Sequence, residues 1–211
     1  MSAVVLALRC PQCGGEFGGT AQDVVFWCAT CRAPFEVTGS TFQARKGALA
    51  QAMIASEGDP IHLPVWAFRV RTTLTWQDAA KAERARELPP IAWVYVTAFR
   101  VHNPSYFADA GQLLTARQPD FRPADTGLPL GCARGMDDAT RFVDAHLLGL
   151  IDRHVDVTGL TLRTAITETV LWGIPYFDEG AVVRDGIFGE TIPAAVVEAL
   201  PDIRKSRTDV R

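Results

Sequence analysis

Hydrophobic and polar residues alternate along the chain from residue 61 onward, and this period of two predicts β-strands. One side of the first stretch carries Trp66, Phe68, Val70, Thr72, Leu74 and Trp76. The opposite side is polar, so the strand is expected to be half-buried. Residues 160–174 alternate in the same way. Residues 91–101 are apolar on both sides, which predicts a strand in the centre of a sheet.

Four other segments have helical composition or helix start signals. The stretch 77–88 is rich in Ala, Glu and Arg and predicts a short exposed helix or a mobile insertion. Helices are also expected over residues 103–117, 137–154 and 191–200, each beginning at a capping residue or a proline. Turn signals at 178–180 and 185–186 predict that residues 174–190 form short antiparallel strands. The order of these elements indicates an α+β sandwich over residues 61–202.

Segments rich in Gly, Pro or charged residues predict a linker, a loop and a tail. Residues 46–60 are expected to be a linker, and their pattern leaves open whether it holds a weak helix. The prolines and glycines of 118–135 predict a long loop. Loops of this length are often functional, but the favoured interpretation here is that the loop only connects its neighbours. The basic residues of 203–211 predict a flexible tail.

Composition changes this picture only modestly. The 211 residues suffice for one ordinary domain and a small one, and 48% hydrophobic with 21% charged residues is a globular composition. No run of about 18 apolar residues predicts a transmembrane helix, and the start lacks a signal-peptide pattern. A cytoplasmic location is therefore expected. The net charge of -3, with no basic cluster in residues 1–46, disfavours a dedicated nucleic-acid binder.

Four cysteines near the N-terminus form the clearest chemical signal. They follow the pattern C-x2-C-x14-C-x2-C and are Cys10, Cys13, Cys28 and Cys31. Two such pairs can place four thiolates at the corners of a tetrahedron, the geometry that Zn2+ prefers. A catalytic zinc keeps one position open for water, whereas four cysteines leave none, so one structural Zn2+ is expected. Iron is the competing metal.

The two cysteine pairs lie on expected β-hairpins, and Pro11, Gly14 and Gly15 surround the first pair. This arrangement resembles the zinc-ribbon family with rubredoxin-like CPxCG knuckles, over about residues 4–45. The resemblance implies that all four cysteines are metal ligands and that residues 1–45 form a zinc ribbon. Two departures are the spacer of 14 residues and Arg32, which stands where the family has a glycine. Zinc is favoured over iron because the second pair lacks the repeated CPxCG motif.

The rest of the chain carries the sequences LPVWAF at 63–68, VYVTAF at 94–99 and LTARQP at 114–119. With the ribbon before them, they resemble uncharacterised bacterial proteins in which a zinc ribbon is fused to an α+β domain. No activity attaches to that resemblance. The larger core is expected to fold without the ribbon, in a chain that begins near Asp59.

Evidence for a reaction is weak. Glu168 falls between Ile166 and Val170 on the apolar side of its expected strand, where burial would raise its pKa and make it a candidate acid or base. Pairing with an arginine is the commoner arrangement for such a residue. Cys132 could be a nucleophile, but a lone cysteine without a histidine placed beside it is usually inert filler. The four histidines are scattered, so the sequence predicts no catalytic residue and no cofactor except Zn2+.

These observations favour a non-enzymatic zinc-ribbon adaptor or assembly protein that binds an unidentified protein partner. One alternative is an enzyme whose site lies near Glu168 and the 118–135 loop. Another is a nucleic-acid-binding regulator that acts through the ribbon, against which the charge balance argues. The sequence leaves the oligomeric state open.

Overall fold

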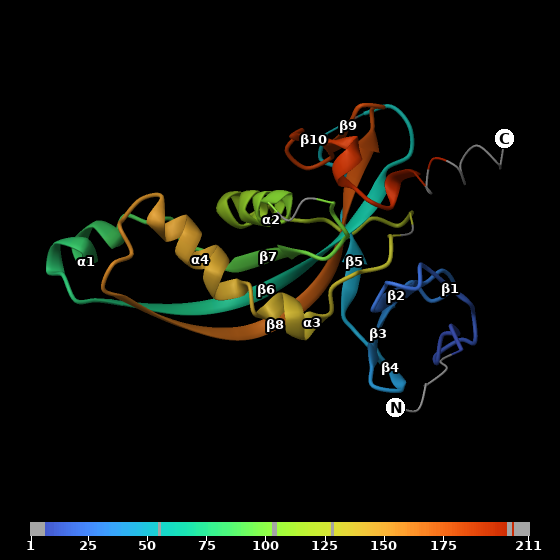
Figure 1. The fold of residues 1–211 in the computed structure, drawn as a ribbon, viewed down its shortest axis with the longest axis horizontal. Helices are drawn as coiled ribbons and strands as arrows, with labels where there is room; N and C mark the ends of the chain where they lie inside the picture. Colours follow the sequence, from blue (N-terminus) through green and yellow to red (C-terminus); the bar gives the residue numbers. More distant parts are fainter. Residues whose placement is uncertain (1–6, 55, 103–104, 128, 202–203, 205–211) are drawn as a thin grey trace.

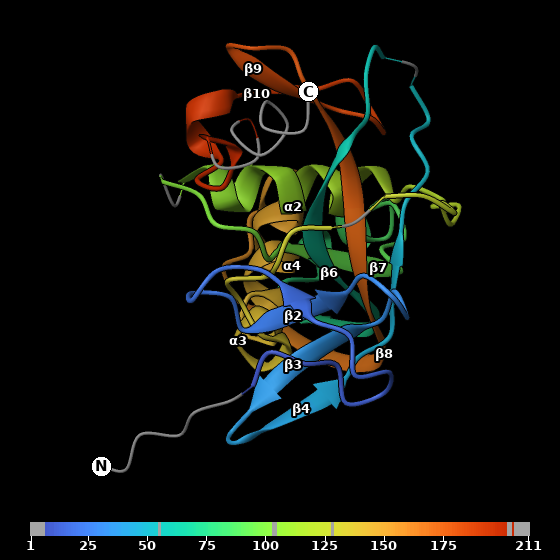
Figure 2. The same ribbon diagram turned by 90° about the vertical axis from the view of Figure 1, so that its right-hand side faces the viewer.

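The computed structural model describes residues 7–54, 56–102, 105–127, 129–201 and 204. A small antiparallel sheet holds the N-terminal part of the chain, in the order β1-β2-β3-β4. Its strands are β1 (Phe17–Gly18), β2 (Val25–Cys28), β3 (Pro34–Thr38) and β4 (Thr41–Ala44). We call residues 7–45 the N-terminal module, and Figure 2 shows it beside the larger sheet.

The larger sheet is mixed and strongly curled, with the strand order β10-β9-β8-β6-β7 and β5 parallel to β8. Its strands are β5 (Gly47–Leu49), β6 (Ile61–Trp76), β7 (Trp93–Thr97), β8 (Leu160–Asp178), β9 (Val182–Asp185) and β10 (Thr191–Pro193). The helices are α1 (Ala79–Ala85), α2 (Ser105–Arg117), α3 (Met136–Thr140) and α4 (Val143–Asp152). The predicted α+β class is confirmed, as a β-rich fold with a curled sheet (Figure 1). No helix in the described part of the chain is long and apolar enough to cross a membrane.

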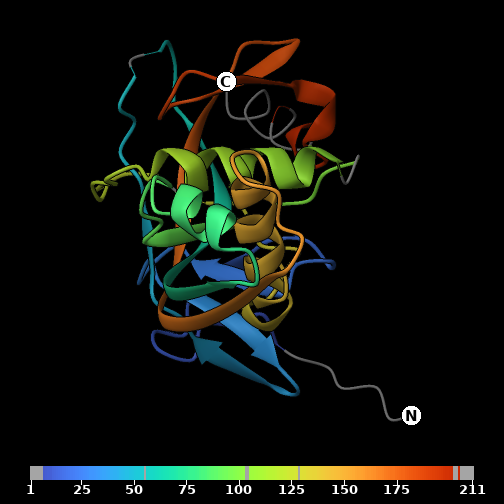
Figure 3. The same ribbon diagram turned by 90° about the vertical axis from the view of Figure 1, so that its left-hand side faces the viewer.

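Strands β6 and β8 pair from Ile61 opposite Tyr176 to Trp76 opposite Leu160, and dominate the fold. Their outer half, residues 69–76 and 160–168, forms a curved ribbon that we call the arm (Figure 1). Strand β7 reaches the base of the arm at Arg69, opposite Trp93. Figure 3 looks along the arm from its free end and shows helices to one side of its tip. Helix α1 follows β6 there, and Asp78 caps it by accepting a hydrogen bond from the Ala80 N–H at 2.8 Å.

Two hydrophobic clusters lie on the two faces of β6. The face predicted from alternation, with Trp66, Phe68 and Val70, packs against side chains of α3 and α4 and against Val25 and Trp27 of the N-terminal module. The opposite face packs against α2 and the end of β8 through the following residues: Leu63, Val65, Ala67, Tyr95, Leu114 and Ile174. The N-terminal module therefore shares a core with the larger sheet and has only a small aromatic cluster of its own.

Strand β7 lies at the edge of the sheet, so the prediction of a central position for residues 91–101 is wrong. Helix α2 and the residue after it complete this edge. The Thr115 hydroxyl accepts the Tyr95 N–H at 2.9 Å, and the Gln118 amide accepts the Trp93 N–H at 2.9 Å and donates to the Trp93 carbonyl at 2.7 Å. Side chains thus take the place of a neighbouring strand, which allows an edge strand to be apolar on both faces.

Three further expectations need correction. Thr191–Pro193 does not cap an α-helix, because it pairs with β9 as β10 and is followed directly by a 3-10 turn, Ala194–Val196. The helix expected over 137–154 is interrupted between α3 and α4. The expected linker 46–60 contains β5, and Leu49 is buried against the sheet.

The expected basic tail 203–211 lies outside the described residues except for Arg204. Its guanidinium donates to Asp178 at 2.6 and 2.8 Å. Residues 103–104, expected to begin the second helix, are also outside the described part. The helix itself, α2, is present from Ser105.

Candidate metal centre

The four cysteines predicted as metal ligands meet at one end of the N-terminal module. Their sulfur atoms all lie within 4.8 Å of one another. The Sγ atoms of Cys10 and Cys31 are 3.5 Å apart, and those of Cys13 and Cys28 are 3.4 Å apart. Each close contact joins one cysteine of the first pair to one of the second, so the two halves of the motif form one cluster that could hold a metal ion.

The first pair is held by a tight backbone turn. The Cys10 N–H donates to the Gly15 carbonyl at 2.7 Å, and the Gly14 N–H donates back to the Cys10 carbonyl at 2.9 Å. Gly14 has a φ of 74°, a left-handed conformation that glycine adopts without steric cost. This turn directs the sulfurs of Cys10 and Cys13 to the same side.

The second pair repeats the same turn. The Cys28 N–H donates to the Ala33 carbonyl at 3.0 Å, and the Arg32 N–H donates to the Cys28 carbonyl at 2.9 Å. Arg32 therefore occupies the position of Gly14, with a φ of 56°. Its side chain donates to the carbonyls of Asp125 and of Gly127, the latter at 3.3 Å. The departure from glycine thus adds a tether from the module to the 118–135 loop.

The sulfurs differ in how readily they ionise. Burial acts to raise the pKa of Cys28, but hydrogen bonds from the Cys31 and Thr30 N–H groups and from the Cys13 thiol lower it to about 6. Burial raises the pKa of Cys31 to about 12. Neighbouring thiolates repel one another, and a divalent cation removes that repulsion. The donor set therefore fits a cation held by four thiolates.

The loop 118–135 joins the N-terminal module to the larger sheet. Cys132 exchanges backbone hydrogen bonds with the module, donating its N–H to the Val25 carbonyl at 2.9 Å and accepting the Val24 N–H at 2.7 Å. Burial raises the pKa of the Cys132 thiol well above its ordinary value. A fully buried thiol of this kind is a poor nucleophile.

Glu36, which no sequence pattern singled out, reinforces the same junction. Its carboxylate accepts the Met136 N–H at 2.9 Å and pairs with Arg45 at 2.7 Å. The side chains of Glu36 and Arg45 are only 10% and 16% exposed. A carboxylate between the apolar residues Phe35 and Val37 in a short strand was the available signal.

Glu168 was expected on one apolar side of β8 with Ile166 and Val170, and this is correct for Val170 but wrong for Ile166. Glu168 lies opposite Arg69 and Val170 lies opposite Ala67, which share a face of β6, whereas Ile166 lies on the other face. Val70 lies opposite Ile166, which leaves Thr167 as an extra residue in a β-bulge. Glu168 forms ion pairs with Lys46 and, at 3.8 Å, with Arg69. The Lys46 ammonium lowers the pKa of Glu168, so this carboxylate is ionised and paired.

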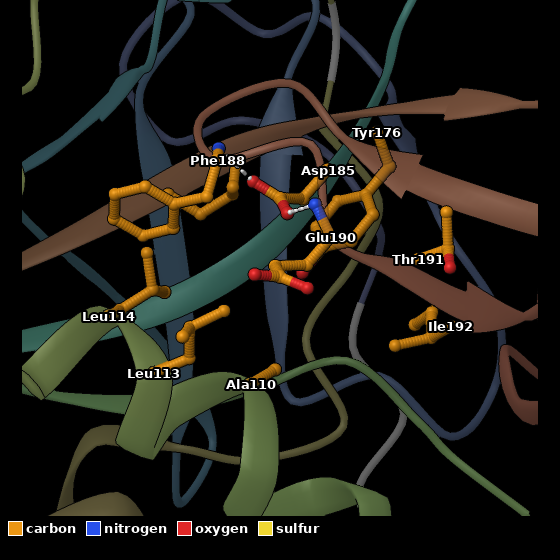
Figure 4. Close-up of a pocket in the computed structure, with 10 residues that line it drawn as sticks. Ala110, Leu113, Leu114, Tyr176, Asp185, Phe188, Glu190, Thr191 and Ile192 are labelled. Carbon is orange, nitrogen blue, oxygen red and sulfur yellow. Dashed lines mark hydrogen bonds between the residues drawn. The ribbon is translucent and has the colours of Figure 1, made fainter. Parts of the chain in front are cut away.

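A pocket of about 340 Å3 lies elsewhere, between α2 and the β9–β10 turn (Figure 4). Its walls are largely apolar. The buried carboxylate of Asp185 accepts N–H groups of Ile187, Phe188 and Glu190 at 2.6 to 2.9 Å. The Glu190 carboxylate pairs with Arg117 at 2.9 Å. These acidic groups hold the turn that forms the wall, and none of the predicted site residues lies in this pocket.

The four-cysteine cluster is the site in which the described residues meet the requirements of a known chemistry. Its surroundings are structural: two matching turns, the Arg32 tether and the Cys132 junction. Comparisons with protein-family models, with curated proteins and with solved structures give no match to this chain.

Proposed function

We propose that the four cysteines bind one structural Zn2+ and that the protein is a non-enzymatic adaptor that binds another protein. The spacing of the four sulfur atoms supports the proposal that they bind Zn2+. In a tetrahedron with Zn–S bonds of about 2.3 Å, neighbouring sulfurs are about 3.8 Å apart. The observed contacts of 3.4 and 3.5 Å, within an overall spread of 4.8 Å, are close to that value. A reducing compartment such as the cytoplasm would keep the thiols available.

The full-length protein is expected to contain about one Zn per chain and little iron when it is purified without added metal. Four thiolates with no open position suit Zn2+, which has no redox chemistry of its own. Elemental analysis of the protein from its native host measures this directly. A protein without metal, or a red iron-containing protein, would contradict the zinc assignment.

The surroundings of the candidate reactive side chains support the adaptor role. Glu168 is ion-paired with Lys46 and Arg69, and Cys132 is fully buried in a backbone junction. The enzyme alternative placed its site near Glu168 and the 118–135 loop, which contains Cys132. The N-terminal module is joined to the larger sheet by a shared core, by backbone pairing and by the Arg32 tether. A module fixed in this way presents its surface at a constant orientation, which lowers the entropic cost of binding a partner.

Comparing two variants of the full chain tests the adaptor role. Glu168→Gln should keep both partner capture and complementation of a deletion strain, because the carboxylate has no chemical task. Cys13→Ser should lose most of both at matched protein level, because the module loses its metal. Capture is measured after cross-linking in the native host, with the partner identified by mass. A Glu168→Gln protein that is folded and partner-bound but inactive in cells would establish the enzyme alternative instead.

A further inference from the structure

The outer face of the arm is open and basic. On this face β6 presents Arg69, Arg71, Thr73 and Thr75, and β8 presents Thr161, Arg163, Ala165 and Glu168. All except Glu168 are exposed. Helices α3 and α4 pack on the other face of these strands, so the open face meets solvent (Figures 1 and 3). Lys46, beside β8, extends the face toward the module and is 66% exposed.

Charge on this face contrasts with that of the whole chain. Four cations, Lys46, Arg69, Arg71 and Arg163, stand against the single carboxylate of Glu168, so the face carries +3 while the chain carries -3. The rest of the protein therefore carries -6. A basic face on an acidic molecule gives a directional attraction for an anionic partner.

Two of these arginines have no ion-pair partner among the described residues. Glu168 is shared by Lys46 and Arg69, whereas Arg71 and Arg163 form no ion pair there. Arg71 lies opposite Ala165 and Arg163 lies opposite Thr73, so the two arginines are diagonal neighbours on the same face. Diagonal neighbours lie within reach of long side chains, so the two guanidinium groups repel each other. A bound anionic group would remove that repulsion.

The dimensions of the face favour an extended protein segment. From Arg69 to Thr75 the strand spans about 20 Å at roughly 3.3 Å per residue, which matches about six residues of an extended chain. Threonine hydroxyls between the arginines can donate further hydrogen bonds to carboxylates.

Other partners fit this face less well. Affinity for duplex DNA rises with the number of phosphates that a protein neutralises, and two of the four cations on this face are already paired with Glu168. Single strands bind by stacking successive bases on exposed aromatic rings. Trp93, opposite Arg69, reaches this face, but it is partly buried and the Arg69 guanidinium already lies over its ring, 6.0 Å from the ring centroid. A second copy placed symmetrically would set Arg71 and Arg163 against the same arginines.

We propose that the outer face of the arm binds an acidic, extended segment of a partner protein, whose carboxylates pair with Arg71 and Arg163. This proposal rests on the adaptor role, and names the kind of surface that the partner presents. Glu168 limits the affinity by holding Lys46 and Arg69.

A labelled ten-residue peptide of alternating Glu and Ser is a suitable probe, because alternate side chains of an extended chain point the same way. Binding to the full-length, metal-loaded protein is measured by fluorescence anisotropy at low salt. The double variant Arg71→Glu/Arg163→Glu should weaken binding at least about tenfold. Arg86→Glu/Arg141→Glu, which changes the net charge equally at exposed sites on other elements, should change it less than about twofold. Glu168→Gln should strengthen binding, and the peptide with Gln in place of Glu should not bind.

Equal losses in both double variants, or no binding of the acidic peptide, would overturn the proposal. Tighter binding of a ten-nucleotide single strand, lost in Arg71→Glu/Arg163→Glu, would assign the face to nucleic acid. Self-association that this variant abolishes would assign it to a second copy. If a partner captured from cells still binds the Arg71→Glu/Arg163→Glu variant, the adaptor role stands but this face is not its binding site. Thermal unfolding of all variants must stay close to that of the natural protein, which the exposure of these arginines makes the expected result.

Discussion

Cys13→Ser is expected to remove the metal and to destabilise the larger sheet as well as the N-terminal module. Metal binding in small zinc modules is coupled to folding and contributes about 10 kcal/mol or more. Without it the module cannot keep Val25 and Trp27 in the core that they share with Trp66 and Leu171. Those two larger-sheet residues are 1% and 0% exposed, and loss of their cover would cost several kcal/mol.

Urea unfolding, followed by tryptophan fluorescence and by circular dichroism, measures this effect together with metal content. Cys132→Ala is the matched control, since it removes a buried cysteine that lies outside the cluster. It should retain one metal per chain and lose only about 1 kcal/mol. If Cys13→Ser loses metal while the larger sheet unfolds at an unchanged midpoint, the two parts fold independently. A chain that begins near Asp59 should then be as stable as the natural one.

Trp27→Ala is expected to lower the free energy of unfolding by about 3–5 kcal/mol, with the metal retained. The indole is only 3% exposed and lies in the shared core, although its backbone belongs to β2 of the module. Its ring packs close to Gly47, at the start of β5. The substitution therefore opens a cavity at the junction itself and leaves the four sulfurs in place.

Trp76→Ala provides the control, because Trp76 is a partly exposed tryptophan at the far end of the arm. The same chromophore is lost, but the expected cost is about 1 kcal/mol. Both variants are compared by urea unfolding and by elemental analysis. Equal costs at the two positions would show that the junction adds nothing to the stability of the fold. Loss of metal in Trp27→Ala would show that the sulfur cluster depends on this packing.

The sequence was sufficient where the information is local. The short spacings within Cys10–Cys13 and Cys28–Cys31 set two matching turns, and the four sulfurs meet as predicted. Alternation along β6 identified the face that carries Trp66 and Phe68, because a strand's side chains point to opposite faces in turn. The composition of 77–88 left a short helix and a mobile insertion open, and the structure has the helix, α1.

Pairing between distant segments could not be read in this way. One extra residue, Thr167, turns Glu168 away from Ile166 and into contact with Lys46 and Arg69. A bulge depends on the register of β8 against β6, about which the residues of β8 alone carry no information. An apparent catalytic candidate thereby became one half of an ion pair on the arm.

The edge position of β7 and the role of Arg32 were also decided by tertiary structure. Strand β7 resembles a central strand in composition, but Thr115 and Gln118 complete its hydrogen bonds from another segment. Arg32 adopts the backbone conformation of Gly14, and its side chain reaches carbonyls more than ninety residues along the chain. Local turns and alternation follow from sterics between neighbouring residues, so the sequence by itself determined them. Register, edge closure and the junction between the module and the larger sheet depend on which distant groups satisfy one another, and only the folded chain settles that.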